Sequence, residues 1–243
     1  MIYLITDFGS QDIYTGQLRA VLLRHFPSAA IIDLLHAVPD QDVLAGAHLL
    51  AALSCSIPEQ DAVLLAVVDP GVGGPRRAIV LQADGRWYVG PDNGLLSVVR
   101  ARARHWRIWE IVWRPPVLSA TFHGRDLFAP IAAMLAKGEW WDGALLEVDN
   151  LDVELAAGDL LQVVYVDHYG NAMTGIRQGV IAHGAHLGAW GRKIPYAQTF
   201  SAVPEGTMFW YENSIGLVEI AGNGCRAAAQ LDLKVGLALQ VIN

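Results

Sequence analysis

Charged residues are scarce in this chain of 243 residues, making up 17% of it, whereas hydrophobic residues make up 53%. A composition of this kind supplies a large core and argues against a disordered chain. Basic residues are the scarcer sign, with 17 Lys and Arg against 24 Asp and Glu, which gives a net charge of −7. Because nucleic-acid binding depends on clustered basic residues, the sequence predicts no nucleic-acid partner.

Cysteine is almost absent: the chain has only Cys55 and Cys225, far apart in sequence. Neither belongs to a Cys-x-x-Cys pair or to a spacing typical of a metal site. Two free thiols in a reduced, cytoplasmic chain are therefore the expectation, with no structural metal.

Long apolar runs are also missing. The longest, residues 43–53, is interrupted by Gly46 and His48 and is too short to span a bilayer. Residues 1–7 lack the charged region and cleavage site of a signal peptide, and we expect a strand there. The sequence thus predicts no membrane partner.

The first half of the chain alternates between strand and helix patterns. Apolar runs typical of buried strands alternate with helical spacing, and this order predicts an α/β domain over residues 1–150, with a parallel-type sheet and helices on both faces. The expected strands are residues 2–5, 29–34 and 63–68, and the expected helices begin at about Asp12 and Gln41.

Further along, Asp84-Gly85 between residues 77–82 and 87–89 predicts a hairpin. Asp92 or Asn93 is a candidate cap for the helix that follows. The next expected elements are a strand at residues 108–113 and a helix at 127–137 that ends at Gly138.

Helical periodicity largely disappears from about Asp142, and short apolar runs alternate with glycines. This pattern predicts a second, all-β domain over residues 158–243, with a barrel-like form. Its expected strands are residues 160–166, 188–191, 207–211, 217–220 and 237–242.

The strand at residues 63–68 ends abruptly in an acid, two prolines, three glycines and two arginines, from Asp69 to Arg77. Ligands of open α/β sheets bind just beyond the carboxyl ends of strands, and glycines let backbone N–H groups approach them. A tight turn with a surface ion pair explains the stretch equally well. A P-loop is excluded because no Gly-Lys-Ser/Thr follows.

Other polar clusters are ambiguous when taken one at a time. Asp7 follows the first strand and suits either two ribose hydroxyls or a local turn. His123 precedes a helix. It is either a functional histidine, since an imidazole can titrate near neutral pH, or a purely structural one. Tyr169, Asn171 and Asn213 offer a ring and amides for adenine, or form ordinary β-turns.

Taken together, these clusters resemble the S-adenosyl-L-methionine hydrolases, also called S-adenosylmethionine hydroxide adenosyltransferases, which are relatives of the fluorinases and chlorinases. The resemblance covers nearly the whole chain. Each motif alone is weak, but all of them in the right order are highly specific. They are residues 6–9 with Asp12, 68–73, 90–96, 121–126, 169–171 and 213–216 with 219–221.

The resemblance implies an N-terminal α/β domain, a C-terminal β-barrel and a homotrimer with its active site between neighbouring subunits. It also implies the reaction. Water or hydroxide attacks C5′ of the ribose of S-adenosyl-L-methionine (SAM) and methionine leaves, which gives adenosine and L-methionine. SAM is the substrate, and no cofactor is implied.

Site residues are likewise implied by the resemblance. The family's Asp–Arg–His catalytic set falls on Asp69, Arg76 and His123. Asp7 matches the ribose-binding acid. On the adenine side, Tyr169 stands where Phe is common. The remaining implied substrate contacts are Asn171, the backbone around Asn223, and Asp12, Asn93, Thr121, Phe122, Asn213 and Ser214.

Two alternatives remain. A SAM-dependent halogenase shares the implied fold but lacks the Asp–Arg–His set, and the fluorinases carry an insertion after the glycine loop that has no room between Arg77 and Trp87. A non-catalytic sensor of adenosine or SAM would not need the set. Methyl transfer is disfavoured because no glycine-rich methyltransferase loop follows the first strand.

For the hydrolase, we expect Arg76 to lower the pKa of a bound water and Asp69 to accept its proton or orient it. His123 completes the hydrogen-bonded set. Whether Asp69 or His123 is the base is left open by the sequence.

Overall fold

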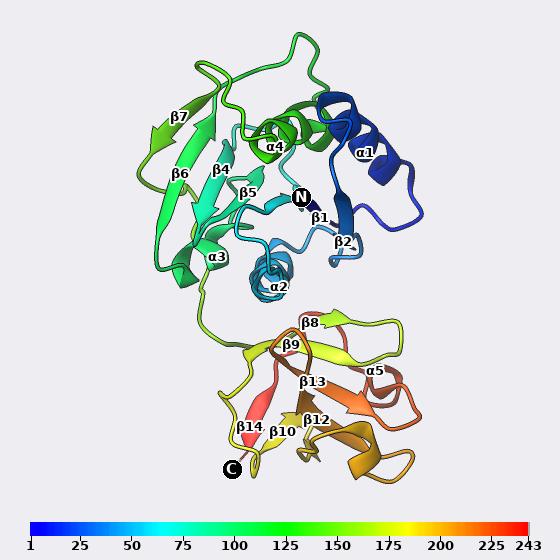
Figure 1. The fold of residues 1–243 in the computed structure, drawn as a ribbon. Coiled ribbons are helices and arrows are strands. Elements are labelled where there is room, and N and C mark those ends of the chain that lie inside the picture. Colours follow the sequence, from blue (N-terminus) through cyan, green and yellow to red (C-terminus); the bar gives the residue numbers. More distant parts are fainter. Residues whose placement is uncertain (243) are drawn as a thin grey trace. The chain divides into compact units, whose positions relative to one another are not determined.

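The structure is a computed structural model that describes residues 1–242 (Figure 1). The chain divides into two compact units, the first comprising Met1–Ala157 and the second beginning at Gly158. Each unit has its own sheets and its own buried core. They are described in turn.

The first unit is built on a seven-stranded sheet with the order β2-β1-β3-β5-β4-β6-β7. Its β1–β2, β1–β3 and β3–β5 pairs are parallel, whereas the pairs from β5 through β4 and β6 to β7 are antiparallel. The strands are β1 Ile2–Thr6, β2 Ile31–Leu35, β3 Val63–Val67, β4 Ala78–Ala83, β5 Arg86–Pro91, β6 Trp106–Ile111 and β7 Leu145–Val148.

The expectation of a parallel-type sheet is therefore wrong for half of it: the sheet is mixed. The reason is the predicted hairpin itself, which is confirmed. Asp84 and Gly85 both have positive φ, at 46° and 88°, as a two-residue hairpin turn requires. A connection this short forces β4 and β5 to run antiparallel.

Helices cover both faces of this sheet, as predicted. In Figure 1, α1 and α4 lie on one side, and α2 and α3 on the other. No helix formed by residues 1–242 is long and apolar enough to cross a membrane. The helices are α1 Ile13–His25, α2 Val43–Cys55, α3 Ser97–Arg102 and α4 Ala129–Ala136, the last preceded by a π-helical turn, Gly124–Phe128.

The α4 helix occupies the centre of the first core. Every residue from Ala129 to Leu135 is buried, so the helix is apolar on all sides and packs among β1, β3, β5 and α1. The expected helix at residues 127–137 thus exists, but it begins earlier, in the π-helical turn. Pro130, near the start of α4, has no N–H to donate to the preceding turn. The N–H of Ala129 donates to the carbonyl of Gly124, five residues back, which is the bond of a π-helical turn.

The predicted cap of α3 is not formed. Its N-cap is Leu96, which makes no side-chain capping bond. Asn93 instead donates from Nδ2 to the carbonyl of Val68, 2.9 Å away, and accepts from Leu95 N–H at 3.2 Å. Its amide therefore fastens the turn after β5 to the end of β3.

The second unit contains two antiparallel sheets, one ordered β12-β13-β9-β8 and the other β11-β10-β14. Two isolated bridges, Gln162 to Ala238 and Tyr196 to Trp210, connect segments of the two sheets. The all-β character is as predicted, but residues 158–242 do not form one closed sheet. The elements are β8 Leu160–Val166, β9 Ala172–Arg177, β10 His186–Ala189, β11 Arg192–Ile194, β12 Met208–Glu212, β13 Leu217–Gly222, β14 Gln240–Ile242 and the short helices Phe200–Ala202 and α5 Ala227–Gln230.

Some strand predictions in this unit are wrong. The strand expected at residues 188–191 ends at Ala189, and Trp190 and Gly191 form the turn to β11, with φ of 52° and 76°. The β14 strand begins only at Gln240, and β9 was not predicted. The core of the unit surrounds Trp210, which is fully buried and donates from Nε1 to the carbonyl of Ala185 at 3.1 Å.

Candidate active site

The structure brings Asp69, Arg76 and His123 into direct contact. Arg76 Nε lies 3.0 and 3.1 Å from the two carboxylate oxygens of Asp69, and Nη2 donates to Oδ2. The same Nη2 lies 3.0 Å from Nδ1 of His123. The guanidinium is thus the central member of a chain of three side chains, with the carboxylate and the imidazole on either side.

This set is largely removed from solvent. The Asp69 side chain is 4% exposed and that of Arg76 is 11% exposed. Charge-assisted, bidentate pairing of this kind is strong and fixes both groups in orientation. Burial and the neighbouring Arg76 charge lower the pKa of His123, although Asp69 opposes them. Together they favour the neutral form of the imidazole.

Local backbone geometry explains how the set assembles. Asp69 follows the buried strand β3, and His123 directly precedes the π-helical turn. The loop after β3, which contains Gly73, passes very close to the segment that precedes His123. A Cβ on Gly73 would lie 2.4 Å from the carbonyl oxygen of Ala120. Gly73 also has a φ of 80°, so only glycine fits there without strain. The guanidinium of Arg76 lies 5.3 Å from the centre of the Phe128 ring.

A small cavity of about 70 Å³ borders Asp69 and His123, and Asp7 lines it as well. Burial raises the pKa of Asp7, and the nearby carboxylates of Asp40 and Asp69 add to this, while a hydrogen bond from Gln41 N–H at 3.0 Å opposes it. The other lining residues are Phe8, Val67, Val72, Thr121, Phe122 and Gly124.

His123 also lines a second cavity of about 240 Å³, together with Arg76. Three arginines surround this cavity: Arg76, Arg77 and Arg114. Arg77 is paired with Asp92 and Asp152. His123 therefore lines two cavities, the first together with Asp7 and Asp69, and the second together with three arginines and Glu110.

Two further predicted residues lie at the first cavity. Thr121 is exposed at its rim. The Phe122 ring contacts the rings of Phe8 and Tyr14, with centroids 5.7 and 5.5 Å apart. Phe8 lies in the first motif, directly after Asp7, and lines the same cavity, although it was not among the predicted substrate contacts.

Asp12 and Asn93 are not part of this cavity's lining. The carboxylate of Asp12 caps α1, accepting from Ile13 N–H at 2.6 Å, and the residue is exposed. The amide of Asn93 fastens the end of β3, as described above. In the structure both side chains act on the fold.

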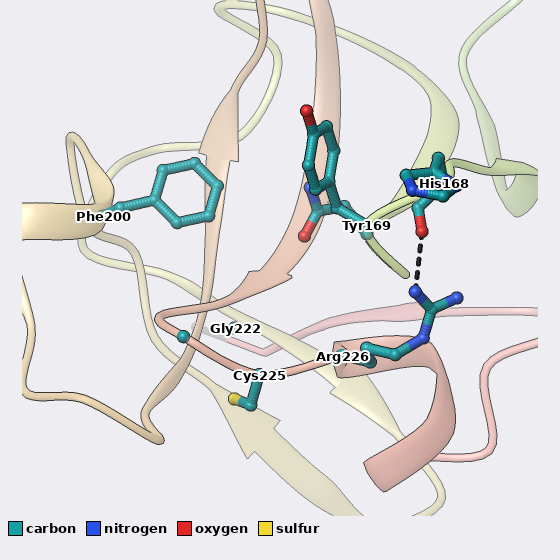
Figure 2. Close-up of a pocket in the computed structure, with 8 residues that line it drawn as sticks. His168, Tyr169, Phe200, Gly222, Cys225 and Arg226 are labelled. Atoms are coloured by element: carbon teal, nitrogen blue, oxygen red, sulfur yellow. Dashed lines mark hydrogen bonds between the residues drawn. The ribbon is translucent and has the colours of Figure 1, made fainter.

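The second unit contains a pocket of about 500 Å³ into which Tyr169 and Phe200 project (Figure 2). The two residues are 74% and 37% exposed, so their rings are available to a ligand. Arg226 Nη1 donates to the carbonyl of His168 at 2.6 Å and so supports the loop that carries Tyr169. The remaining lining residues are Asn171, Gly222, Gly224 and Cys225.

The predicted asparagines differ in their availability. Asn171 lines the pocket, and Asp167 accepts from both its backbone N–H and its Nδ2, at 2.8 and 3.1 Å. This pairing leaves its amide oxygen without a partner among the hydrogen bonds of residues 1–242. Asn223 donates to the carbonyl of Val203. Its neighbours Gly222 and Gly224 line the pocket, but Asn223 itself does not.

The side-chain amide of Asn213 bonds to its own turn and to strand β13. Its Nδ2 donates to Glu219 at 2.8 Å, and its Oδ1 accepts from the N–H groups of Ile215 and Leu217. Ser214 is exposed in the same turn. The structure thus gives Asn213 a role in the fold, and neither residue lines the 500 Å³ pocket.

Sequence reasoning missed Phe200 and Arg226. Phe200 belongs to a single short 3₁₀ turn, about 30 residues from Tyr169, and no pattern in the sequence relates the two. Arg226 follows the Gly-Asn-Gly-Cys segment, which was singled out only for its backbone. Within residues 1–242, no group of three or more His, Cys, Asp or Glu side chains is placed to hold a metal ion.

The chain matches two family models in succession. Residues 2–143 match the SAM hydroxide adenosyltransferase N-terminal domain, and residues 161–240 match the SAM hydroxide adenosyltransferase C-terminal domain. Together the two models cover most of both structural units.

Individual relatives agree with the family match. The (R)-S-adenosyl-L-methionine hydrolase of Thermus thermophilus is 39% identical, with 99% of each chain covered. A crystal structure of an uncharacterized conserved protein from Thermotoga maritima matches with a TM-score of 0.91 and 32% identity over 100% of both chains. The fluorinase of Nocardia brasiliensis is more distant, at 26% identity over 99% of this chain and 96% of its own.

Proposed function

The chain belongs to the SAM hydroxide adenosyltransferase family, and from this premise we propose that it is an enzyme that hydrolyses S-adenosyl-L-methionine to adenosine and L-methionine. The observation that carries the proposal is the contact between Asp69, Arg76 and His123 beside a cavity that also contains Asp7. A carboxylate and a guanidinium fixed together suit the activation of water, and a second carboxylate suits the hydroxyls of a ribose.

The proposed step is a displacement at C5′ of the ribose. The oxygen of a water molecule held by Asp69 forms a bond to C5′, the C5′–S bond breaks, and its electron pair stays on sulfur as the neutral thioether of methionine. The proton of water passes to the Asp69–Arg76–His123 set and then to solvent. Sulfonium is a good leaving group, so no general acid is required.

Charge explains why a buried site favours this step. The sulfonium is positive and the developing hydroxide is negative, so charge is neutralised as the transition state forms. Transfer of both from water to a pocket of low polarity then favours the transition state over the separated ions. Arg76 stabilises negative charge on the attacking oxygen, and Asp69 orients it.

The pocket of the second unit is the proposed adenine subsite. Tyr169 and Phe200 project rings into it, and the amide oxygen of Asn171, whose Nδ2 is bound to Asp167, is suited to accept from the adenine amino group. Base-to-aromatic stacking is worth about 1–3 kcal/mol per base, which is enough to hold the nucleoside while the first unit supplies the chemistry.

We further propose that the protein works in the cytoplasm as a homotrimer, with each active site formed where neighbouring subunits meet. The reacting residues all lie within residues 1–157 and the proposed adenine contacts all lie after Gly158. Mixing two inactive variants, Asp69→Asn and Tyr169→Ala, under conditions that exchange subunits tests this. Recovered activity supports a shared site, and no recovery in demonstrably mixed trimers contradicts it.

A SAM-dependent halogenase is the second candidate, because fluorinases are among the relatives. The Asp69 carboxylate disfavours it, since a negative charge at the nucleophile position repels a halide but accepts a proton from water. A non-catalytic sensor is the third, and it has no need for the interlocked set.

Product analysis separates the candidates. The purified protein is incubated with SAM in halide-free buffer, and the products are followed by chromatography. Adenosine and methionine in equal amounts support the hydrolase. A 5′-halo-adenosine that appears only with added chloride or fluoride supports the halogenase, and binding without turnover supports the sensor.

A further inference from the structure

The contact between Arg76 and His123 determines which imidazole nitrogen carries the proton. Nη2 of Arg76 lies 3.0 Å from Nδ1 of His123, and a guanidinium nitrogen can only donate hydrogen bonds. Nδ1 must therefore accept with its lone pair. In a neutral imidazole the proton is then on Nε2, so the ring has no second lone pair to offer.

Burial, with a smaller effect of the neighbouring charges, lowers the pKa of His123 and so favours the neutral ring. Arg76 and Arg114 disfavour a positive charge on His123, whereas Asp69 and Asp126 favour it, and burial disfavours it most. Together these effects lower the pKa of the imidazole. Protonation at Nδ1 would also place two N–H groups face to face and break the bond to Arg76.

We propose that His123 is a positioning residue and that Asp69 is the base: Nδ1 of His123 holds the guanidinium of Arg76, and Arg76 in turn holds the carboxylate of Asp69 at the attacking water. This inference rests on the proposed hydrolase function and assigns the roles within it. The carboxylate keeps lone pairs beyond those used by Arg76, and Asp69 borders the cavity directly. As the oxygen of water bonds to C5′ and the C5′–S pair leaves with sulfur, the proton of water goes to Asp69.

The substitution that isolates this role is His123→Asn. An asparagine amide oxygen can lie close to the position of Nδ1 and accept from Arg76, but an amide does not take up a proton in the accessible pH range. His123→Ala removes the acceptor and serves as the matched comparison. Thermal unfolding and calorimetric binding of adenosine establish that both variants are folded and bind the nucleoside.

Positioning predicts that His123→Asn keeps kcat within about tenfold of the wild type, since one neutral acceptor replaces another. His123→Ala should lose about 10²-fold or more, because Arg76 and Asp69 are no longer held in place. The pH profile of kcat/KM should keep the same limbs in wild type and His123→Asn. An asparagine variant as slow as the alanine variant, or one that loses a limb of the profile, would overturn the proposal.

A second measurement does not depend on turnover. In protein labelled with ¹⁵N-histidine, the His123 signals are assigned by their loss in His123→Asn. The proposal predicts an unprotonated Nδ1 and a protonated Nε2 throughout the pH range of activity. A proton on Nδ1, or a titration that follows the pH profile, would overturn it. If the wild type forms no adenosine, the proposed function fails, and the tautomer is still decided by these signals.

Discussion

The two candidate binding regions of this molecule, the Asp69–Arg76–His123 site and the pocket at Tyr169, are constructed in opposite ways. In the first unit, Asp69 and Arg76 are buried and joined by several hydrogen bonds. In the second, Tyr169 and Phe200 project rings into an open pocket, and Tyr169 is mostly exposed. The first region fixes charges before any ligand arrives, whereas the second offers apolar surface that a ligand can cover.

This difference indicates that transition-state stabilisation and nucleoside affinity come from different parts of the molecule. Charges that must stabilise a transition state are most effective when they are fixed in advance and shielded from water. Affinity for a nucleoside needs area and stacking, which exposed rings supply at little cost in conformational entropy. We therefore expect damage to the first region to reduce kcat and damage to the second to raise KM.

The largest expected effect comes from Asp69→Asn. Loss of general-base assistance should reduce kcat by about 10²–10⁴-fold, with little change in the affinity for adenosine. Steady-state kinetics and calorimetry measure the two quantities. Asp149→Asn, at an exposed acid of the same unit, is the control. A rise in KM without a fall in kcat would break the contrast between the regions.

Tyr169→Ala should have the next largest effect, and on the other parameter. Loss of one stacking partner is worth about 1–3 kcal/mol, or roughly a tenfold to hundredfold rise in KM, with kcat nearly unchanged. Tyr169→Phe keeps the ring and should behave like the wild type. If the alanine variant lost kcat instead, the exposed pocket would have to take part in the chemistry.

A smaller effect concerns the free energy of unfolding and its dependence on pH, through the buried Glu219 of the second unit. Glu219 is 2% exposed, and it accepts from Tyr211 Oη and Asn213 Nδ2. Burial raises its pKa above the ordinary value of 4.5, although both hydrogen bonds oppose this. The folded protein therefore holds this proton more tightly than the unfolded chain. The resulting stability is fully present below about pH 4.5 and is lost as pH rises through the folded pKa.

Glu219→Gln isolates this contribution. The amide keeps both hydrogen bonds, because its oxygen can accept from Asn213 and its nitrogen can donate to Tyr211, but it does not ionise. Urea unfolding over the range from about pH 4 to pH 8 should show a weaker fall in stability for the variant than for the wild type. Parallel curves for the two proteins would show that Glu219 stays ionised in the fold.

The smallest expected effect is that of metal removal. The proposed chemistry depends on Asp69, Arg76 and His123 and uses no metal ion. Exhaustive dialysis against a chelator should therefore leave the initial rate unchanged. A loss of rate that a divalent cation restores would show that the buried ion pair does not provide the activation alone.

Local signals in the sequence predicted much of the fold. The strand and helix alternation of the first unit and the Asp84-Gly85 hairpin are observed, because short-range periodicity and turn chemistry determine them. The mixed character of the sheet follows from that same hairpin. What the local pattern could not show is pairing at a distance, such as β9 between β8 and β13.

The site was predictable only in part, because residue type does not reveal which atoms are already committed. Asn93 and Asn213 matched family motifs, yet their amides already make bonds that hold the fold: Asn93 donates to the carbonyl of Val68, and Asn213 bonds to Glu219 and to Leu217 N–H. Phe200 matched nothing and lies in the pocket. Residue type also does not reveal a close approach of two strands: a Cβ at Gly175 would lie 2.6 Å from Cβ of Leu160.

The most direct test of the central claim follows the oxygen of water. Turnover of SAM in H₂¹⁸O, with products analysed by mass spectrometry, reports which bond the nucleophile forms. Attack at C5′ predicts adenosine with one ¹⁸O at its 5′ position and unlabelled methionine, at a rate that falls in Asp69→Asn. Adenosine without the label, or label found in the amino-acid product, would contradict the account.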